Sequence, residues 1–322
     1  MTFTLSHLCT TYNYANYLPE HLAGVLSQCH RPTRVIVSDD HSPRDTPEEI
    51  QRACAGYPDA EVVIQPTNLG SARHVHMLCN AVETDAYITM SADDTLVDPG
   101  FFAEACRILE DDPGVVAVFG QMQHVDERGR TISGALPVVE TLAPTTRIEG
   151  RTLRRWMAFE NPVPSVCVVV RTKRSSGIAA YPIFNEYCTD WLHFYLLTLS
   201  GDFVRLNRIV CRYRVQAAGL YQQHLRSPLA RQRKDEGYAA LLEWPGLDDE
   251  DRRLLRIGRA RDWFSQAKIQ DKPLALLRYW REPGAWLGAM EALSAVAAFR
   301  LQRANAQLRS RARREFTGGS VP

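Results

Sequence analysis

The stretch Arg34-Val-Ile-Val-Ser-Asp-Asp40 decides the fold that this sequence predicts. Its β-branched centre lies between Pro32 and two adjacent aspartates, a pattern typical of a buried strand that ends at a polar edge. Apolar runs of similar length precede and follow it, and they alternate with segments in which apolar residues recur at helical spacing. Repeated strand–helix units of this kind predict an α/β fold, with a mostly parallel sheet and helices on both of its faces.

The expected elements follow this alternation along the first two thirds of the chain. We expect strands over residues 3–9, 34–38, 61–65, 86–90, 114–119, 166–170, 203–207 and 210–215. We expect helices over residues 18–28, 46–55, 72–82, 101–111, 152–159 and 190–200. A hairpin is predicted over residues 120–132, and an irregular segment over residues 133–150. After about residue 226 the pattern is helical and basic.

Length and composition exclude several classes of protein. The 322 residues are 45% hydrophobic and 23% charged, which fits a globular protein and not a disordered, collagen-like or coiled-coil one. The formal net charge is +1, which argues against a nucleic-acid partner. This total hides an asymmetry, because the balance is −6 over residues 1–225 and +7 over residues 226–322. We therefore expect an α/β domain over residues 1–225 and a helical, basic region over residues 226–322.

The cysteines and the N-terminus favour a cytoplasmic protein. The eight cysteines are scattered without a C-x-x-C pair, so they predict neither a zinc site nor a disulfide framework. The first residues lack the basic and apolar segments of a secretory signal. The longest apolar stretch, residues 285–299, is interrupted by Glu291 and is too short to span a bilayer.

Two pairs of adjacent aspartates end predicted strands, and mostly parallel sheets bind their ligands at the carboxyl ends of the strands. Asp93-Asp94 can hold a hard divalent cation that keeps open positions for diphosphate oxygens. Asp39-Asp40 can accept hydrogen bonds from a uracil or a ribose. For both pairs, helix capping or a simple polar turn is the structural alternative.

Three further segments carry side chains that could bind a ligand or take part in catalysis. The turn over residues 10–14 offers Thr10 and Tyr12 to a nucleobase. Asp190 lies where a helix begins, so it either caps that helix or takes a proton from an attacking hydroxyl. Arg214 follows Tyr213 at a strand end, where its guanidinium either binds a diphosphate or lies on a solvated edge.

Taken together and in order, these segments resemble the family 2 inverting glycosyltransferases, which have the GT-A fold. The resemblance covers roughly residues 3–216 and rests on six loose motifs. These motifs are Cys9-Thr-Thr-Tyr-Asn13 with Val35-Ile-Val-Ser-Asp-Asp-His-Ser42, Asn68-Leu-Gly70 with Arg73, Tyr87-Ile-Thr-Met-Ser-Ala-Asp-Asp94, Val125-Asp-Glu-Arg-Gly129, Asp190-Trp191-Leu192 and Tyr213-Arg214.

The resemblance implies a Rossmann-like catalytic domain over residues 1–225 that transfers a sugar from a nucleotide diphosphate sugar, in the first place a UDP-sugar. The acceptor is expected to be a hydroxyl of a glycan or a lipid-linked acceptor in bacterial surface polysaccharide synthesis. The resemblance also assigns roles: Thr10, Tyr12, Asp39 and Asp40 hold the nucleoside, Arg73 and Arg214 the diphosphate, Asp94 with Asp93 holds Mn²⁺ or Mg²⁺, and Asp190 is the catalytic base.

Two positions depart from the pattern of that family. The metal motif reads Ser91-Ala-Asp-Asp94 and does not open with an aspartate, so metal binding rests on Asp93 and Asp94 alone. Many relatives have a histidine two residues after the late arginine, where this chain has Gln216. A glutamine is a poorer metal ligand, and His224 is a candidate substitute.

The C-terminal region and the overall function each leave alternatives open. Residues 271–322 combine apolar helical stretches with an arginine-rich end, which fits either the surface of an anionic membrane or a helical cap with a solvated tail. Two rival functions are a sugar-nucleotide pyrophosphorylase and a non-catalytic sugar- or nucleotide-binding protein of the same fold. The oligomeric state stays open.

Overall fold

The computed structural model describes residues 3–132, 145–172, 187–216 and 229–266, together with residues 177, 179, 180, 185, 219 and 227. The chain divides into two compact units, Met1–Ala240 and Leu241–Pro322. The domain boundary that the composition predicts after residue 225 lies within the first unit.

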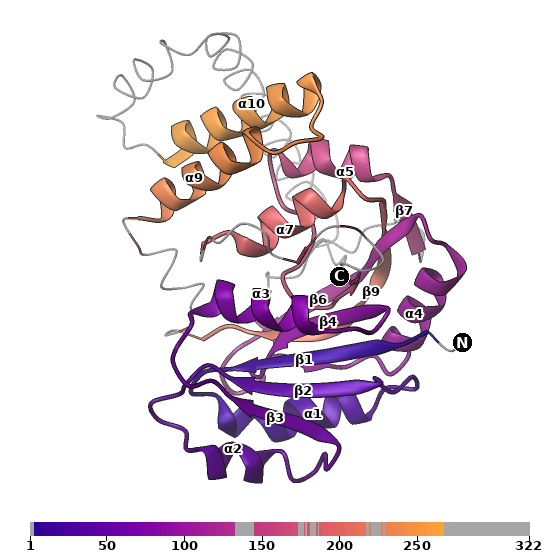
Figure 1. Cartoon of the computed structure of the whole chain (residues 1–322), viewed down its shortest axis with the longest axis vertical. Coiled ribbons are helices and arrows are strands. Elements are labelled where there is room, and N and C mark those ends of the chain that lie inside the picture. The colour runs from indigo at the N-terminus through magenta and orange to yellow at the C-terminus, as the bar shows by residue number, and fades with distance from the viewer. Residues whose placement is uncertain are drawn as a thin grey trace, which may run out of the picture. The chain divides into compact units, whose positions relative to one another are not determined.

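Over its described residues, the first unit is built on a mixed sheet in the order β3-β2-β1-β4-β8-β6-β9-β5, with β7 paired to β9 (Figure 1). The strands are β1 (Leu5–Thr11), β2 (Arg34–Asp39), β3 (Ala60–Ile64), β4 (Ala86–Ser91), β5 (Thr95–Leu96), β6 (Val115–Val125), β7 (Thr145–Ile148), β8 (Val168–Arg171) and β9 (Asp202–Arg214). Strands β3, β2, β1 and β4 are mutually parallel. Strand β8 is antiparallel to both β4 and β6, and β9 runs parallel to β6.

Helices cover both faces of this sheet. One face packs against α1 (Leu18–Leu26), α2 (Pro47–Ala53) and α4 (Phe101–Asp111), whose apolar side chains form one core with alternate residues of the strands. The opposite face carries α3 (Ser71–Ala81), α5 (Gly150–Met157) and α7 (Thr189–Leu197) (Figure 1). The other helices among the described residues are η1 (Ala15–Tyr17), α9 (Ala230–Leu242) and α10 (Asp249–Gln266).

The structure confirms the predicted α/β architecture and changes it in three places. The sheet is mixed, because β8 enters between β4 and β6 in the direction opposite to both, while β6 and β9 keep the direction of β4. Strand β7 lies within the segment that was expected to be irregular, where pairing with β9 orders it. Strand β9 is continuous where two strands were expected, although its pairing with β6 shifts register between Arg205 and Ile209. Within that stretch Arg208 forms ion pairs with Asp98 at 2.5 Å and Glu104 at 2.6 Å.

Buried histidines form part of the interior on both faces. Nε2 of His193 in α7 lies 3.0 Å from the hydroxyl of Tyr87 in β4, which ties α7 to the sheet. On the other face, Nε2 of His7 lies 2.8 Å from Nε2 of His21 in α1. Burial lowers the pKa of His193 to about 3 and that of His21 to about 4, so both rings are neutral near pH 7.

The second unit is described up to Gln266, at the end of α10. Within it, the guanidinium of Arg252 donates hydrogen bonds to the carbonyl oxygens of Leu242, Leu247 and Trp244. One arginine thus satisfies the chain end of α9 and the turn that follows it. Among the described residues, no helix is both long enough and apolar enough to cross a bilayer. The basic segment over residues 271–322 lies outside the described part of the chain.

We expect His193→Gln to flatten the pH dependence of stability. The unfolded chain binds a proton at this histidine near pH 6.5, whereas the folded protein does so only near pH 3. Stability is therefore lost as the pH falls below 6.5, by up to about 1.4 kcal/mol per pH unit from this group. Urea unfolding at pH 7.5 and 5.5 measures the slope for the parent and the variant. His41→Asn, at an exposed histidine, is the control, and equal slopes in parent and His193→Gln contradict the prediction.

Candidate active site

Strand β1 brings the sequence-predicted acidic pairs to one edge of the sheet. Thr10 in β1 is opposite Ser38 of β2 on one side and Ser91 of β4 on the other. Beyond these pairs, the backbone N–H of Asp40 donates to Thr11 at 3.0 Å, and that of Ala92 donates to Thr10 at 2.9 Å. The two acidic turns therefore flank the end of β1, as the parallel arrangement predicted.

The first acidic pair holds two turns in place. Both oxygens of Asp39 accept hydrogen bonds from Ser42, from its backbone N–H at 2.9 Å and its hydroxyl at 2.5 Å. The oxygens of Asp40 accept the backbone N–H groups of Leu69 at 2.8 Å and Gly70 at 3.0 Å, directly before α3. Both carboxylates are buried. Asp39 thus stabilises a polar turn, which was the alternative to ligand binding, and Asp40 anchors the start of α3.

The turn that carries Tyr12 is tied to the turn after β2. Asn13 has a left-handed backbone with φ of 61°, and its N–H donates to the hydroxyl of Ser42 at 2.7 Å. Its side-chain oxygen accepts the N–H of Arg44 at 3.0 Å, and the N–H of Ala15 donates to Asp45 at 2.9 Å. Between these ties Tyr12 is 44% exposed, so its ring is open to a ligand. A rigid turn that presents an exposed aromatic ring suits the stacking of a nucleobase.

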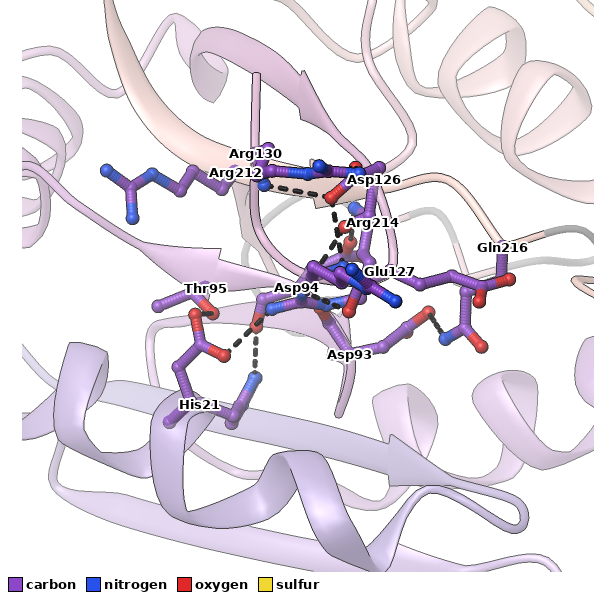
Figure 2. A network of polar contacts seen from close by, with 12 residues as sticks. His21, Asp93, Asp94, Thr95, Asp126, Glu127, Arg130, Arg212, Arg214 and Gln216 are labelled. Atoms are coloured by element: carbon purple, nitrogen blue, oxygen red, sulfur yellow. Dashed lines mark hydrogen bonds and ion pairs between the residues drawn. The ribbon is translucent and has the colours of Figure 1, made fainter. Parts of the chain in front are cut away.

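The second acidic pair forms the centre of a buried polar network (Figure 2). Oδ1 of Asp94 accepts the backbone N–H of Arg214 at 3.0 Å, and Oδ2 of Asp93 accepts the side-chain amide of Gln216 at 2.7 Å. The carbonyl oxygen of Asp94 lies 2.7 Å from Nδ1 of His21. Residues of α1, of the turn after β4 and of the end of β9 thus meet at this pair.

Electrostatics make the Asp94 carboxylate costly to ionise. Burial raises the pKa of Asp94 well above its usual range, and the charge of Asp93 raises it further, while the N–H and the charge of Arg214 oppose both. Burial and the charge of Asp93 also raise the pKa of the Tyr14 phenol to about 12. A bound cation would offset the negative charge of the two carboxylates, so such a pair is suited to a metal ion.

The acidic pair fits a divalent cation that takes most of its ligands from substrate phosphates and water. Each carboxylate has one oxygen engaged by the hydrogen bonds above, so the pair has further oxygen atoms for a hard cation. Among the described residues, no group of three or more His, Cys, Asp or Glu side chains could hold a metal ion. Mg²⁺ and Mn²⁺ sites of this kind use one or two carboxylates with substrate phosphates and water.

The side chain of Arg214 is held inside the protein. Its guanidinium is buried and donates from Nε to the carbonyl of Asp93 at 3.1 Å and from Nη2 to Glu20 at 2.8 Å. Nη1 donates to the carbonyls of Asp126 at 3.4 Å and Glu127 at 3.1 Å, in the turn after β6. These bonds direct its donors into the protein.

Asp190 is the second residue of α7, toward the carboxyl edge of the sheet. The helix ends at Leu197, and the chain then enters β9 at Asp202 opposite Val115, the first residue of β6. Helix α7 therefore runs from the carboxyl edge toward the amino edge, and its first turn faces the side on which β4 ends. Burial raises the pKa of Asp190, although backbone N–H groups at the helix start lower it. A raised pKa makes this carboxylate a better proton acceptor.

The remaining sequence-predicted residues have simple placements. Thr10 lies at the end of β1 with its hydroxyl 3.5 Å from the carbonyl of Met90, and Arg73 is exposed on the first turn of α3. His224 lies outside the described residues, whereas Gln216 contacts Asp93 directly. Sequence reasoning missed Glu20 and His21, because nothing in their local pattern distinguishes them from ordinary helix residues.

Comparison with known proteins identifies the family of this chain. Residues 6–176, just over half of the chain, match the family model described as Glycosyl transferase family 2. Protein CgeD of Bacillus subtilis is 27% identical over 138 residues, and the uncharacterized protein Rv1520 of Mycobacterium tuberculosis is 26% identical over 225 residues. These matches cover 40% and 67% of this chain, but only 32% and 60% of those two proteins.

Solved structures with the same fold include complexes with nucleotide sugars. The S. aureus TarS 1–349 structure in complex with UDP-GlcNAc has a TM-score of 0.64 at 16% identity and covers 88% of this chain and 81% of its own. The mannosyltransferase PcManGT from Pyrobaculum calidifontis, in complex with GDP-Man and Mn²⁺, has a TM-score of 0.57 at 18% identity. That match covers 94% of this chain and 79% of PcManGT. At these identities the likeness shows the fold, here the GT-A fold.

We expect Asp94→Asn to raise stability and to abolish metal binding. The asparagine is neutral, and its carbonyl oxygen can still accept the N–H of Arg214. The free energy of unfolding at pH 7.5 should rise by about 1 kcal/mol, which raises the midpoint of thermal unfolding by about 2–4 °C. Calorimetric titration with Mn²⁺ should give no heat of binding.

The control for this substitution is Asp59→Asn, at an exposed aspartate, which should change neither quantity. An Asp94→Asn chain that unfolds below the parent's midpoint, or that binds Mn²⁺ like the parent, contradicts the prediction.

Proposed function

Because this chain belongs to glycosyl transferase family 2, we propose that it transfers a sugar, with inversion, from a UDP-sugar to a hydroxyl of a glycan or of a lipid-linked acceptor. The observation that carries this proposal is the buried pair Asp93-Asp94 at the end of β4, flanked through β1 by Asp39-Asp40. Acids at the carboxyl ends of neighbouring parallel strands suit a nucleotide diphosphate, with its base at one pair and its phosphates at the other.

The arrangement around β1 supports the nucleoside half of the proposal. Tyr12 offers an exposed ring for stacking, and Thr10 offers a hydroxyl beside it. Asp39 and Asp40 both use backbone or hydroxyl donors of the protein, but a carboxylate oxygen has a second lone pair for the N–H of a uracil. The TarS complex with UDP-GlcNAc is the reason for favouring UDP over GDP, and PcManGT with GDP-Man is the precedent for the rival donor.

Asp94, assisted by Asp93, is proposed to hold Mg²⁺ or Mn²⁺. When bound there, the cation neutralises charge on the diphosphate as that group leaves the sugar. PcManGT, which has the same fold, is a Mn²⁺ complex. Arg73 is proposed to bind the diphosphate, because it is exposed on the first turn of α3, where the N-terminal end of the helix also favours an anion.

Asp190 is proposed to be the catalytic base. Its carboxylate takes the proton of the acceptor hydroxyl as the oxygen attacks the anomeric carbon, on the face opposite the diphosphate. The C–O bond to the acceptor forms as the bond to the diphosphate oxygen breaks, which inverts the configuration in one displacement. The raised pKa of Asp190 and its place at the start of α7 support this role.

We expect Asp190→Asn to slow transfer by about 10²–10⁴-fold and to leave donor binding intact, because an amide cannot accept the proton. Release of UDP in the presence of an acceptor measures the rate, and calorimetry measures the affinity for the donor. Asp235→Asn, at a half-buried aspartate of α9 outside the proposed site, is the control. Turnover by Asp190→Asn at the parent's rate removes Asp190 from the role.

A panel of donors tests the proposed reaction itself. We expect metal-dependent hydrolysis of at least one UDP-sugar and none of the GDP- or dTDP-sugars, with loss of activity after treatment with EDTA and recovery with Mn²⁺. Release of nucleotide only from GDP-sugars would replace UDP by GDP in the proposal. Binding of a UDP-sugar without any release would favour a non-catalytic binding protein of the same fold.

A further inference from the structure

The guanidinium of Arg214 joins three segments that are far apart in the sequence. Nη2 forms an ion pair with Glu20 of α1, at a separation of 194 residues, and Nη1 reaches the carbonyls of the turn after β6. Nε donates to the carbonyl of Asp93, in the turn after β4. Four of the five N–H donors of the guanidinium thus have acceptors within the protein. Figure 2 shows these contacts converging on one side chain.

The same residue also holds the acidic pair from its backbone. The N–H of Arg214 donates to Oδ1 of Asp94, while Nε holds the carbonyl of Asp93, so one residue fixes both members of the pair. Its guanidinium lies 4.8 Å from the centre of the Tyr17 ring, and the side chain is only 4% exposed. A flat guanidinium with fixed donors can make its four side-chain bonds at once, which a lysine ammonium cannot, whereas the bond to Asp94 comes from the backbone N–H.

We propose that Arg214 is a positioning residue that holds Asp93 and Asp94 in their metal-binding arrangement, and that it is not a ligand of the diphosphate. The inference rests on the proposed function, because it takes the acidic pair as the metal site. It reverses the role that the sequence pattern implied for this arginine. Mutation of the groups that hold metal ligands in place typically lowers metal affinity by about 10–100-fold.

The test separates metal binding from nucleotide binding. Mn²⁺ is titrated into the protein without any nucleotide, and the signal of free Mn²⁺ in electron paramagnetic resonance gives the affinity. We expect Arg214→Gln and Arg214→Lys to weaken Mn²⁺ binding by about 10–100-fold, because neither side chain can replace the fork of donors. Arg212→Gln removes the same charge from an exposed position two residues earlier in β9, and should bind Mn²⁺ like the parent.

Binding of UDP and of uridine in EDTA distinguishes the two roles of Arg214. If Arg214 is a positioning residue, its substitution leaves the metal-free affinities for UDP and for uridine unchanged. If it is a ligand of the diphosphate, its substitution lowers the affinity for UDP and leaves the affinity for uridine unchanged. Metal-free loss of UDP affinity in Arg214→Gln, with Mn²⁺ affinity intact, overturns the proposal. Substitution of the buried guanidinium of Arg214 can prevent folding. A second variant that keeps Arg214 is therefore included.

Glu20→Gln is that second variant, since it removes only the ion-pair partner, whose side chain is 48% exposed. We expect Mn²⁺ affinity to fall about two- to fivefold, a small effect because water screens a half-exposed pair. An unchanged affinity in Glu20→Gln, if Arg214→Gln and Arg214→Lys do not fold, overturns the positioning role. A parent that binds neither Mn²⁺ nor UDP refutes the proposed function, and the positioning role with it. A parent that binds both, with Arg214 variants that match it, refutes the positioning role alone.

Discussion

Two adjacent carboxylates are buried at the end of β4, and the structure of this edge depends on how their charge is tolerated. Charge in an interior is costly unless hydrogen-bond donors and opposite charge surround it. The donors come from Arg214 at the end of β9, which reaches Asp94, and from Gln216 just after it, which reaches Asp93. The backbone of the turn is held from α1 by His21. The acidic pair is therefore stable only when α1, β4 and β9 have come together.

The mixed sheet is what allows these elements to meet. Because β8 runs antiparallel between β4 and β6, strand β6 has the same direction as β4, and β9 follows β6 in parallel. The carboxyl end of β9 thus reaches the edge at which β1, β2 and β4 end. A loop connection alone would leave Arg214 without a fixed position, whereas at the end of the thirteen-residue strand β9 it pairs with Val125 of β6, after register shifts earlier in the strand. The order and direction of the strands thus bring to the acidic pair the donors that its charge requires.

Much of the fold was predictable from local patterns in the sequence. The helix expected over residues 101–111 is observed at those bounds, and the first four strands lie within two residues of their expected ends. Strand β7 was missed because its residues, Thr-Thr-Arg-Ile, carry no apolar run, and only its partner β9 makes it a strand. Two strands, over residues 203–207 and 210–215, were expected in place of β9 because polar residues interrupt the apolar pattern between them. The observed strand is continuous there but shifts its register against β6 between Arg205 and Ile209.

By itself, the sequence determined which residues stand at the carboxyl ends of the strands, because hydrophobic periodicity and turn residues are local signals. It also determined the family, through motifs within residues 6–176. Only the tertiary structure decided what those polar groups bind. Asp40 holds Leu69 and Gly70, and Arg214 holds Glu20 and the turn after β6. A hydrogen bond forms only where two atoms approach within about 3 Å, and that approach is set by strand pairing between distant segments, not by the identity of either residue.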